Sequence, residues 1–165
     1  MPSLGPGLHA LLLGRTINGE RLLDVQQCID FLDTRDDVAD EIPGIMDNSS
    51  GGTTTLYASA LLPRITHAMP SCSFCTYHAS LLGVFHCLCN YVPDLFQWVD
   101  MPDLLGCFAP KPVVIVHAQQ DEFFPLEGTR EAFQHIQAIY AEADALENCQ
   151  PVVGDNGHRF YADLA

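Results

Sequence analysis

Three residues of the 165-residue chain could together cleave an ester, namely Ser49, Asp121 and His158. A serine becomes a nucleophile when a histidine removes its hydroxyl proton and a carboxylate holds that histidine in the correct tautomer. The three residues occur in the order nucleophile, acid, base, and each follows a short apolar segment. These segments read as strands near residues 44–47, 112–117 and 150–153. The pattern therefore predicts a Ser-Asp-His triad that works through an acyl-enzyme.

The surroundings of Ser49 read as a strand, a sharp turn and a helix, which is the pattern of a nucleophile elbow. Small residues are needed two positions before and after the nucleophile, where larger side chains would meet the strand and the helix. Gly51 meets this need, whereas Asp47 stands where the pattern has glycine. Ser50 supplies a backbone N–H for the oxyanion hole, and its hydroxyl is a competing nucleophile. Taken alone, the Ser-Ser-Gly-Gly-Thr run is also typical of an ordinary flexible turn.

Four segments carry a resemblance to a known family: Asn48 to Tyr57, Leu62 to Ile65, Asp121 with Phe124-Pro125, and Gly157 to Tyr161. They resemble the bacterial α/β-hydrolases grouped with acetyl xylan esterases and dienelactone-hydrolase-like esterases. The similarity runs from about Gly14 to the C-terminus. It implies hydrolysis of carboxylic esters of the acetyl or carbohydrate-ester type, with Ser49, Asp121 and His158 in the catalytic roles.

Strands that alternate with helices predict a parallel sheet covered by helices. A fourth strand is expected near residues 65–70, and helices are expected over 20–34, 53–62 and 127–146. We expect a three-layer α/β/α fold with a mostly parallel sheet of about four strands in a single domain, 1–165. Within it we expect an irregular leader over 1–19, a covering segment of short helices over 71–108, and a short helix after His158.

The resemblance implies about eight strands in a complete α/β-hydrolase fold, so the chain corresponds to the C-terminal half. The missing strands would precede Gly14, together with the loop that carries the second oxyanion-hole donor. The first strand here would then have an unpaired apolar edge, which predicts a homo-oligomer or another partner at this edge. Two hypotheses stay open: an ester hydrolase, and a degenerate remnant that acts as an interaction or oligomerisation module. The sequence does not distinguish an esterase from a peptidase of this fold.

The amino-acid composition limits the classes of binding partner that we expect. The formal charge is −14, from 21 acidic against 7 basic residues. Nucleic acids and anionic membrane surfaces demand clusters of Lys and Arg, so we expect neither as a partner. A small ester substrate is expected instead. The N-terminus has no signal-peptide pattern and no window is apolar enough to span a membrane, which favours a cytoplasmic location.

The chain has seven cysteines, an odd number that favours reduced thiols in this compartment. Four of them occur at short spacing: Cys72, Cys75, Cys87 and Cys89. Thiolates at such spacing can hold zinc. Structural zinc sites usually have two or more residues between paired cysteines, whereas Cys87 and Cys89 have one residue between them. We therefore favour buried thiols that simply pack. The predicted chemistry needs no metal and no other cofactor.

Overall fold

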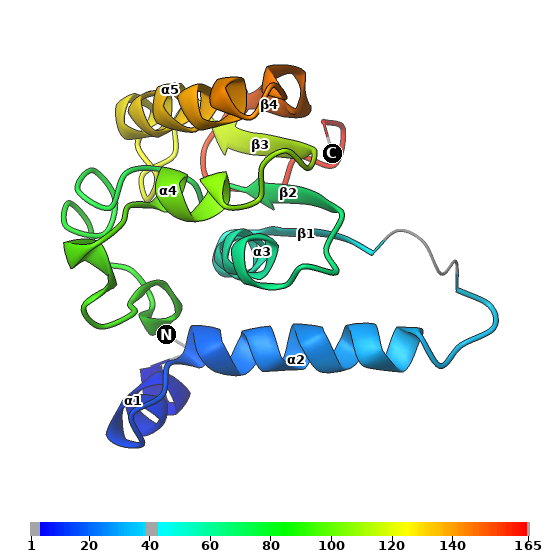
Figure 1. Cartoon of the computed structure of the whole chain (residues 1–165). Coiled ribbons are helices and arrows are strands. Elements are labelled where there is room, and N and C mark those ends of the chain that lie inside the picture. Colours follow the sequence, from blue (N-terminus) through cyan, green and yellow to red (C-terminus); the bar gives the residue numbers. More distant parts are fainter. Residues whose placement is uncertain (1–3, 39–42, 165) are drawn as a thin grey trace.

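The strands that precede the predicted catalytic residues belong to one sheet. The computed structural model describes residues 4–38 and 43–164 (Figure 1). Its strands form one parallel sheet in the order β1-β2-β3-β4. They are β1 (Gly44–Asn48), β2 (His67–Ser71), β3 (Val113–Ala118) and β4 (Cys149–Gly154). Because all four strands run the same way, their carboxyl ends meet at one edge of the sheet. The predicted α/β class with a parallel sheet is confirmed.

One face of the sheet is covered by α3, α4 and α5 (Figure 1). These helices are α3 (Ser50–Leu61), α4 (Met101–Gly106) and α5 (Leu126–Glu142), and α2 (Ile17–Leu32) packs beside α3. Between the helices and the strands lies the main apolar core, which includes Leu56, Phe74, Ile115, Ile136 and Tyr140. Burying an aliphatic or aromatic side chain stabilises a fold by about 1.5–3 kcal/mol. This face therefore supplies most of the apolar stabilisation.

The other face carries a smaller buried cluster, in which Cys72, Val116 and Ala118 pack against Tyr161. The Tyr161 ring packs on Gly154, where an added Cβ would approach the ring to 2.2 Å. Its hydroxyl accepts the Asn156 N–H (3.1 Å) and donates to the Gly157 carbonyl (2.9 Å). These bonds fold the tail back onto its own loop. The predicted helix after His158 is wrong, because bends and one turn occupy the tail as far as Leu164.

The predicted irregular leader over 1–19 is also wrong for the part that the structure describes. Helix α1 (Leu4–Leu12) lies there, and α2 begins at Ile17; residues 1–3 lie outside the described residues. Pro6 is tolerated because it falls in the first turn of α1, where N–H groups have no acceptor within the helix. Gly7 packs directly on Leu88, since an added Cβ would meet that side chain at 2.8 Å.

The segment 71–108 holds three short helices among turns and bends, namely η1 (Leu88–Asn90), η2 (Leu95–Gln97) and α4, and its role as a covering segment stays a prediction. Asp100 begins α4 with a capping box, in which its side chain accepts a backbone N–H of the first turn and the Asp103 side chain accepts the Asp100 N–H. The assignment of residues 1–165 to a single domain stays a prediction. Among the residues that the structure describes, no helix has the length and apolarity needed to cross a bilayer.

Candidate active site

The three predicted residues lie at the carboxyl edge of the sheet and contact one another. Ser49 follows β1, Asp121 follows β3 and His158 follows β4. The Ser49 Oγ lies 2.7 Å from His158 Nε2, and His158 Nδ1 lies 2.8 Å from Asp121 Oδ2. These side chains thus form a continuous hydrogen-bonded chain, although they are 109 and 37 residues apart in sequence.

Ser49 stands on a strained turn. Its backbone has φ 58° and ψ −121°, a conformation that non-glycine residues rarely adopt and that costs about 1–3 kcal/mol. The Ser49 N–H donates to the Ser71 carbonyl on β2 (2.9 Å), and its own carbonyl accepts the Thr53 N–H of α3 (2.9 Å). These two bonds fix both sides of the turn, so the strain is retained and the Oγ projects beyond the strand.

Asp47 is accommodated because Gly51 has no side chain. A Cβ built on Gly51 would lie 2.1 Å from both Cγ and Oδ2 of Asp47, so the carboxylate already fills the space beside the first turn of α3. The Asp47 side chain is exposed, and its Oδ1 accepts the Asn48 N–H at 2.7 Å. The departure from the glycine pattern therefore leaves the strand, turn and helix intact.

Asp121 is buried and holds a charge. Burial by itself would raise the pKa of this carboxyl, but hydrogen bonds from His158 and from the backbone outweigh it and lower the pKa. Its Oδ1 accepts the N–H groups of Phe123 (2.8 Å) and Phe124 (3.0 Å). With both oxygens engaged, the carboxylate is ionised at neutral pH and fixed in orientation.

His158 is held between this carboxylate and two aromatic rings. Its ring lies 5.1 Å from that of Phe123 and stacks on that of Phe124 at 6.0 Å between centroids. An ionised carboxylate can only accept, so the proton of His158 is assigned to Nδ1. The lone pair of Nε2 then faces the Ser49 hydroxyl, which is the arrangement that a general base requires.

Two residues that the sequence analysis missed hold the loop that carries Asp121. The Phe123 carbonyl accepts the Ser80 hydroxyl at 2.7 Å and lies 3.1 Å from His86 Nε2. His86 is buried against both phenylalanine rings, and this burial lowers its pKa. No motif marks Ser80 and His86, because their partner is a backbone carbonyl about 40 residues away in sequence.

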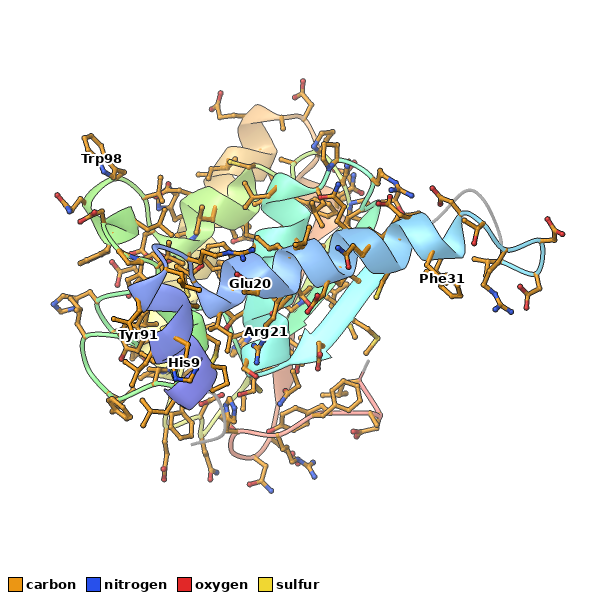
Figure 2. The ribbon with its side chains drawn as sticks, turned by 90° about the horizontal axis from the view of Figure 1, so that it is seen from below. His9, Glu20, Arg21, Phe31, Tyr91 and Trp98 are labelled. Carbon is orange, nitrogen blue, oxygen red and sulfur yellow. A yellow bond between two sulfur atoms is a disulfide. The ribbon has the colours of Figure 1, made fainter. Side chains whose placement is uncertain are left out.

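Ser50, the predicted oxyanion-hole residue, begins α3. Its N–H belongs to the first turn, whose N–H groups have no acceptor within the helix and form the positive end of the helix dipole. Its carbonyl accepts Arg21 Nη1 at 3.1 Å, and Figure 2 shows Arg21 reaching from α2 toward this turn. His158 Nε2 is bonded to the Ser49 hydroxyl, so the geometry favours Ser49 over Ser50 as the nucleophile.

Two of the four closely spaced cysteines match the favoured prediction of buried thiols, and the other two do not. Cys87 and Cys89 are joined in a disulfide, so the expectation of reduced thiols is wrong for this pair. Cys72 and Cys75 are free and buried. Over residues 4–38 and 43–164, metal-ligating side chains gather in a group of three only at Cys72, Asp121 and His158. The four cysteines of the alternative zinc hypothesis do not come together in this part of the chain.

Comparisons with known proteins point to hydrolases. No protein-family model matches the chain. A sequence relative, "Putative hydrolase YtaP" of Bacillus subtilis (strain 168), is 26% identical over 151 residues. The match covers 90% of this chain and 50% of the relative, so the chain spans half the length of that protein.

Several solved esterases share the fold. A protein from Bacteroides fragilis NCTC 9343 described as a "putative acetyl xylan esterase" superposes with a TM-score of 0.74 at 14% identity, over 90% of this chain and 39% of its own. A glucuronoyl esterase of carbohydrate esterase family 15 from Caldicellulosiruptor kristjansonii gives 0.71 at 16%, over 86% and 45%. Methylesterase BT1017 gives 0.71 at 23%, over 88% and 32%. The chain therefore has the α/β-hydrolase fold, and the predicted resemblance to acetyl xylan esterase-type hydrolases is confirmed for the fold.

Proposed function

We propose that this chain is a serine hydrolase that cleaves carboxylic esters through Ser49, Asp121 and His158. One observation carries the proposal: the hydrogen-bonded chain from the Ser49 hydroxyl through His158 to Asp121, at 2.7 and 2.8 Å, with the serine on a strained turn. Strained backbone conformations are concentrated at active sites. A nucleophile, a base and a carboxylate within hydrogen-bond reach of one another are the signature of an activated serine.

The reaction follows from this arrangement. His158 Nε2 takes the Ser49 hydroxyl proton as the Oγ attacks the ester carbonyl carbon, and Asp121 stabilises the imidazolium that forms. The imidazolium then gives its proton to the departing alcohol, which leaves an acyl group on Ser49. Water, deprotonated by His158, attacks the acyl-enzyme, and His158 then returns the proton to the Ser49 Oγ as the carboxylic acid leaves. The proposed steps use no cofactor.

The negative oxygen of each tetrahedral intermediate needs hydrogen-bond donors. The Ser50 N–H, in the first turn of α3, is the donor that we assign. A hydrolase oxyanion hole usually has a second donor, and losing one typically costs about 100- to 1000-fold in rate. We therefore expect the Ser50 N–H to contribute a factor of this size to the rate.

For the substrate we propose acetyl or carbohydrate esters. The solved structures that share the fold are described as a "putative acetyl xylan esterase", a glucuronoyl esterase and a methylesterase, and this wording applies to those proteins. These descriptions suggest two arms for a substrate screen. An acetylated sugar tests a small acyl group with a sugar as leaving group, and a glucuronate methyl ester tests a sugar acyl group with a small leaving group.

Labelling with a fluorophosphonate probe, followed by peptide mapping, tests the proposal. We expect one adduct per chain, located on Ser49 and absent from Ser49→Ala. His158→Ala should slow labelling by about 10⁴-fold, since the base is lost. Ser50→Ala is the matched control, because it deletes the neighbouring hydroxyl and keeps the backbone N–H. An adduct on Ser50, or no adduct on a folded chain, would overturn the assignment.

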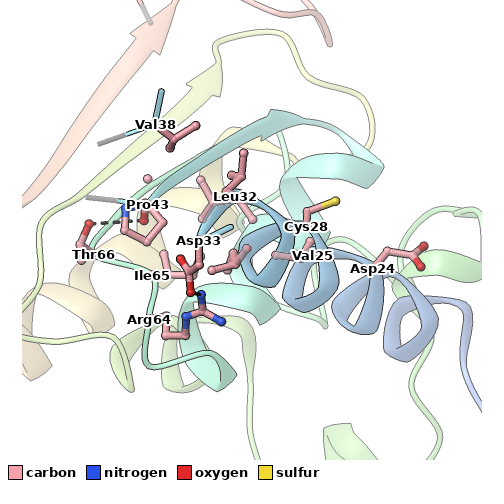
Figure 3. Close-up of a pocket in the computed structure, with 13 residues that line it drawn as sticks. Asp24, Val25, Cys28, Leu32, Asp33, Val38, Pro43, Arg64, Ile65 and Thr66 are labelled. Atoms are coloured by element: carbon pink, nitrogen blue, oxygen red, sulfur yellow. Dashed lines mark hydrogen bonds and ion pairs between the residues drawn. The ribbon is translucent and has the colours of Figure 1, made fainter. Parts of the chain in front are cut away.

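A second candidate function is favoured by the outer edge of the sheet. Strand β1 pairs with β2 on one side, and in the part of the chain that the structure describes no strand lies on its other side. Between this edge and α2 lies an open groove of about 710 Å³. Figure 3 shows its apolar lining, with Val25 and Leu32 from α2 and with Pro43 and Ile65.

We also propose that this edge pairs with the same edge of a second copy. Alternate residues of a strand direct their N–H and C=O groups to opposite sides. Ser49 donates to β2, so Gly44 and Met46 direct theirs outward, whereas the Asn48 N–H is already bonded to Asp47. The charge of −14 on each copy opposes this contact, so salt should strengthen it.

Sedimentation at several protein and salt concentrations tests the dimer. We expect a dimer that strengthens with salt and is weakened by Met46→Lys, which places a charge on the exposed edge. Trp98→Lys is the control, because Trp98 is 82% exposed and lies outside β1 and the residues that line the groove. A monomer at every concentration would contradict this proposal and leave the hydrolase unaffected.

A further inference from the structure

A third side chain lies beside the His158 and Asp121 pair. The Sγ of Cys72, a carboxylate oxygen of Asp121 and a ring nitrogen of His158 all lie within 4.8 Å of one another. The three residues follow β2, β3 and β4, so the sheet itself brings them together. The mechanism proposed above uses Asp121 and His158 and gives Cys72 no role.

Cys72 is placed unusually for a packing residue. It is fully buried, and its backbone has φ 45°, which non-glycine residues seldom adopt and which clusters at functional sites. Its thiol donates to the Arg159 carbonyl at 3.4 Å, and its N–H donates to the Val116 carbonyl at 2.8 Å. The strand register therefore aims the thiol at the loop that carries His158.

The donor set suits zinc. Thiolate sulfur, imidazole nitrogen and carboxylate oxygen are the ligands that Zn²⁺ takes in proteins, at about 2.3, 2.0 and 2.1 Å. In a tetrahedral site with these bond lengths, a sulfur and an oxygen ligand stand about 3.6 Å apart. Cys72, Asp121 and His158 would supply three ligands, and water would take the fourth position.

We infer that Cys72, Asp121 and His158 form a site for a thiophilic divalent metal ion such as Zn²⁺, and that the bound ion blocks hydrolysis. The metal site rests on the geometry of these three residues alone. Only the inhibition rests on the function proposed above.

The inhibition follows from proton accounting at His158. The ion would bind Nδ1, the nitrogen that faces Asp121, and the proton on Nδ1 would move to Nε2 through solvent. Nε2 would then donate a hydrogen bond and could no longer take the proton of Ser49. The Cys72 thiol would release its own proton to solvent as the Zn–S bond forms. Each ion bound therefore releases one proton, with no change of oxidation state.

The first experiment uses Co²⁺, which substitutes for Zn²⁺ and gives a thiolate-to-metal charge-transfer absorption. The protein is titrated in a Cys28→Ser/Cys107→Ser background, because these two thiols are exposed and would bind metal on their own. We expect a band that saturates at one Co²⁺ per chain. Cys72→Ser should abolish it, and Ser49→Ala should keep it because Ser49 is not a ligand.

Cys75→Ser is the matched control for Cys72→Ser. Cys75 is also free, buried and bonded through its thiol to a carbonyl, that of Pro125 at 3.6 Å, but it is not one of the three clustered residues. The band should survive this change. A band that persists in Cys72→Ser, or no band in the parent protein, would overturn the metal site. Thermal unfolding of each variant shows that it is folded.

The second experiment separates the site from its effect. Zn²⁺ should slow fluorophosphonate labelling of Ser49, and Cys72→Ser should need at least about tenfold more Zn²⁺ for the same effect. Labelling that is insensitive to saturating Zn²⁺ would overturn the inhibition while the Co²⁺ band keeps the site. Absence of labelling without any metal would refute the hydrolase, and the Co²⁺ titration would still decide the metal site.

Discussion

Because Asp47 contacts Gly51, we predict that Gly51→Ala destabilises the natural chain but stabilises a chain that lacks the Asp47 side chain. In the natural chain, Gly51→Ala places a Cβ 2.1 Å from the Asp47 carboxylate, so this side chain must turn away. Turning costs about 0.5–1.5 kcal/mol in rotamer energy. It also breaks the 2.7 Å bond to the Asn48 N–H, which is worth about another 1.5 kcal/mol.

Against this cost stands the gain from replacing glycine within a helix, about 0.5–1 kcal/mol. We therefore expect Gly51→Ala to lower the free energy of unfolding by about 1–2 kcal/mol. In an Asp47→Gly background the three atoms nearest to the added Cβ are gone, since all of them belong to Asp47. There the same change should raise the free energy of unfolding by up to about 1 kcal/mol.

A double-mutant cycle measured by urea unfolding gives the coupling between the two positions. We expect about 1.5–3 kcal/mol, which corresponds to a difference of several degrees in Tm for a chain of this length. Fluorophosphonate labelling should slow in Gly51→Ala and recover when Asp47→Gly is added, because the turn that carries Ser49 lies between the two residues. Additive effects within about 0.5 kcal/mol, or a stabilising Gly51→Ala in the natural chain, would refute this account of the elbow.

Three further predictions rest on burial and charge. Asp121→Asn should slow labelling of Ser49 by about 10⁴-fold. Because the folded-state pKa of Asp121 is lowered, its charge contributes stability above its unfolded pKa of about 3.9, and this stability is lost as the pH falls through the lower folded value. The Tm difference between the natural chain and Asp121→Asn should thus shrink below about pH 4, and a difference that grows on acidification would contradict it. Gly154→Ala should destabilise the fold by about 1–3 kcal/mol through its clash with Tyr161. Gly5→Ala lies in α1 and meets nothing within 4 Å, so it should instead stabilise the fold by up to about 1 kcal/mol. Equal effects in thermal unfolding would count against the packing of the tail. Burial raises the pKa of three free thiols to about 11. Iodoacetamide at about pH 8 should therefore modify only the two exposed cysteines of the folded chain, which mass spectrometry can show. Rapid modification of a buried thiol would disprove this prediction. The three protected residues are Cys72, Cys75 and Cys149.

Much of the site could be read from the sequence because it depends on short local signals. An apolar run followed by a polar residue marks the end of a buried strand, and in a parallel sheet all such ends meet at one edge. Ser49, Asp121 and His158 each follow such a run, so their convergence could be expected before the sheet was known. The strands and long helices were predicted to within a few residues for the same reason.

Other features depend on contacts between distant parts of the chain. Helix α1 was missed because glycine and proline suggest irregular structure locally, while Gly7 is needed for close packing on Leu88. The expected C-terminal helix fails because Tyr161 bonds back to its own loop and covers Gly154. In both cases tertiary packing overrides local propensity.

Side-chain neighbours at the site were likewise decided only by the fold. The sequence singled out Cys72 for its spacing to other cysteines, whereas the register between β2 and β3 places its thiol beside Asp121 and His158. His86 and Ser80 hold a carbonyl that carries no sequence signal. The sequence alone determined which residues end the strands, because that information is local. Only the tertiary structure decided what surrounds them, because register and packing bring together residues that no spacing relates.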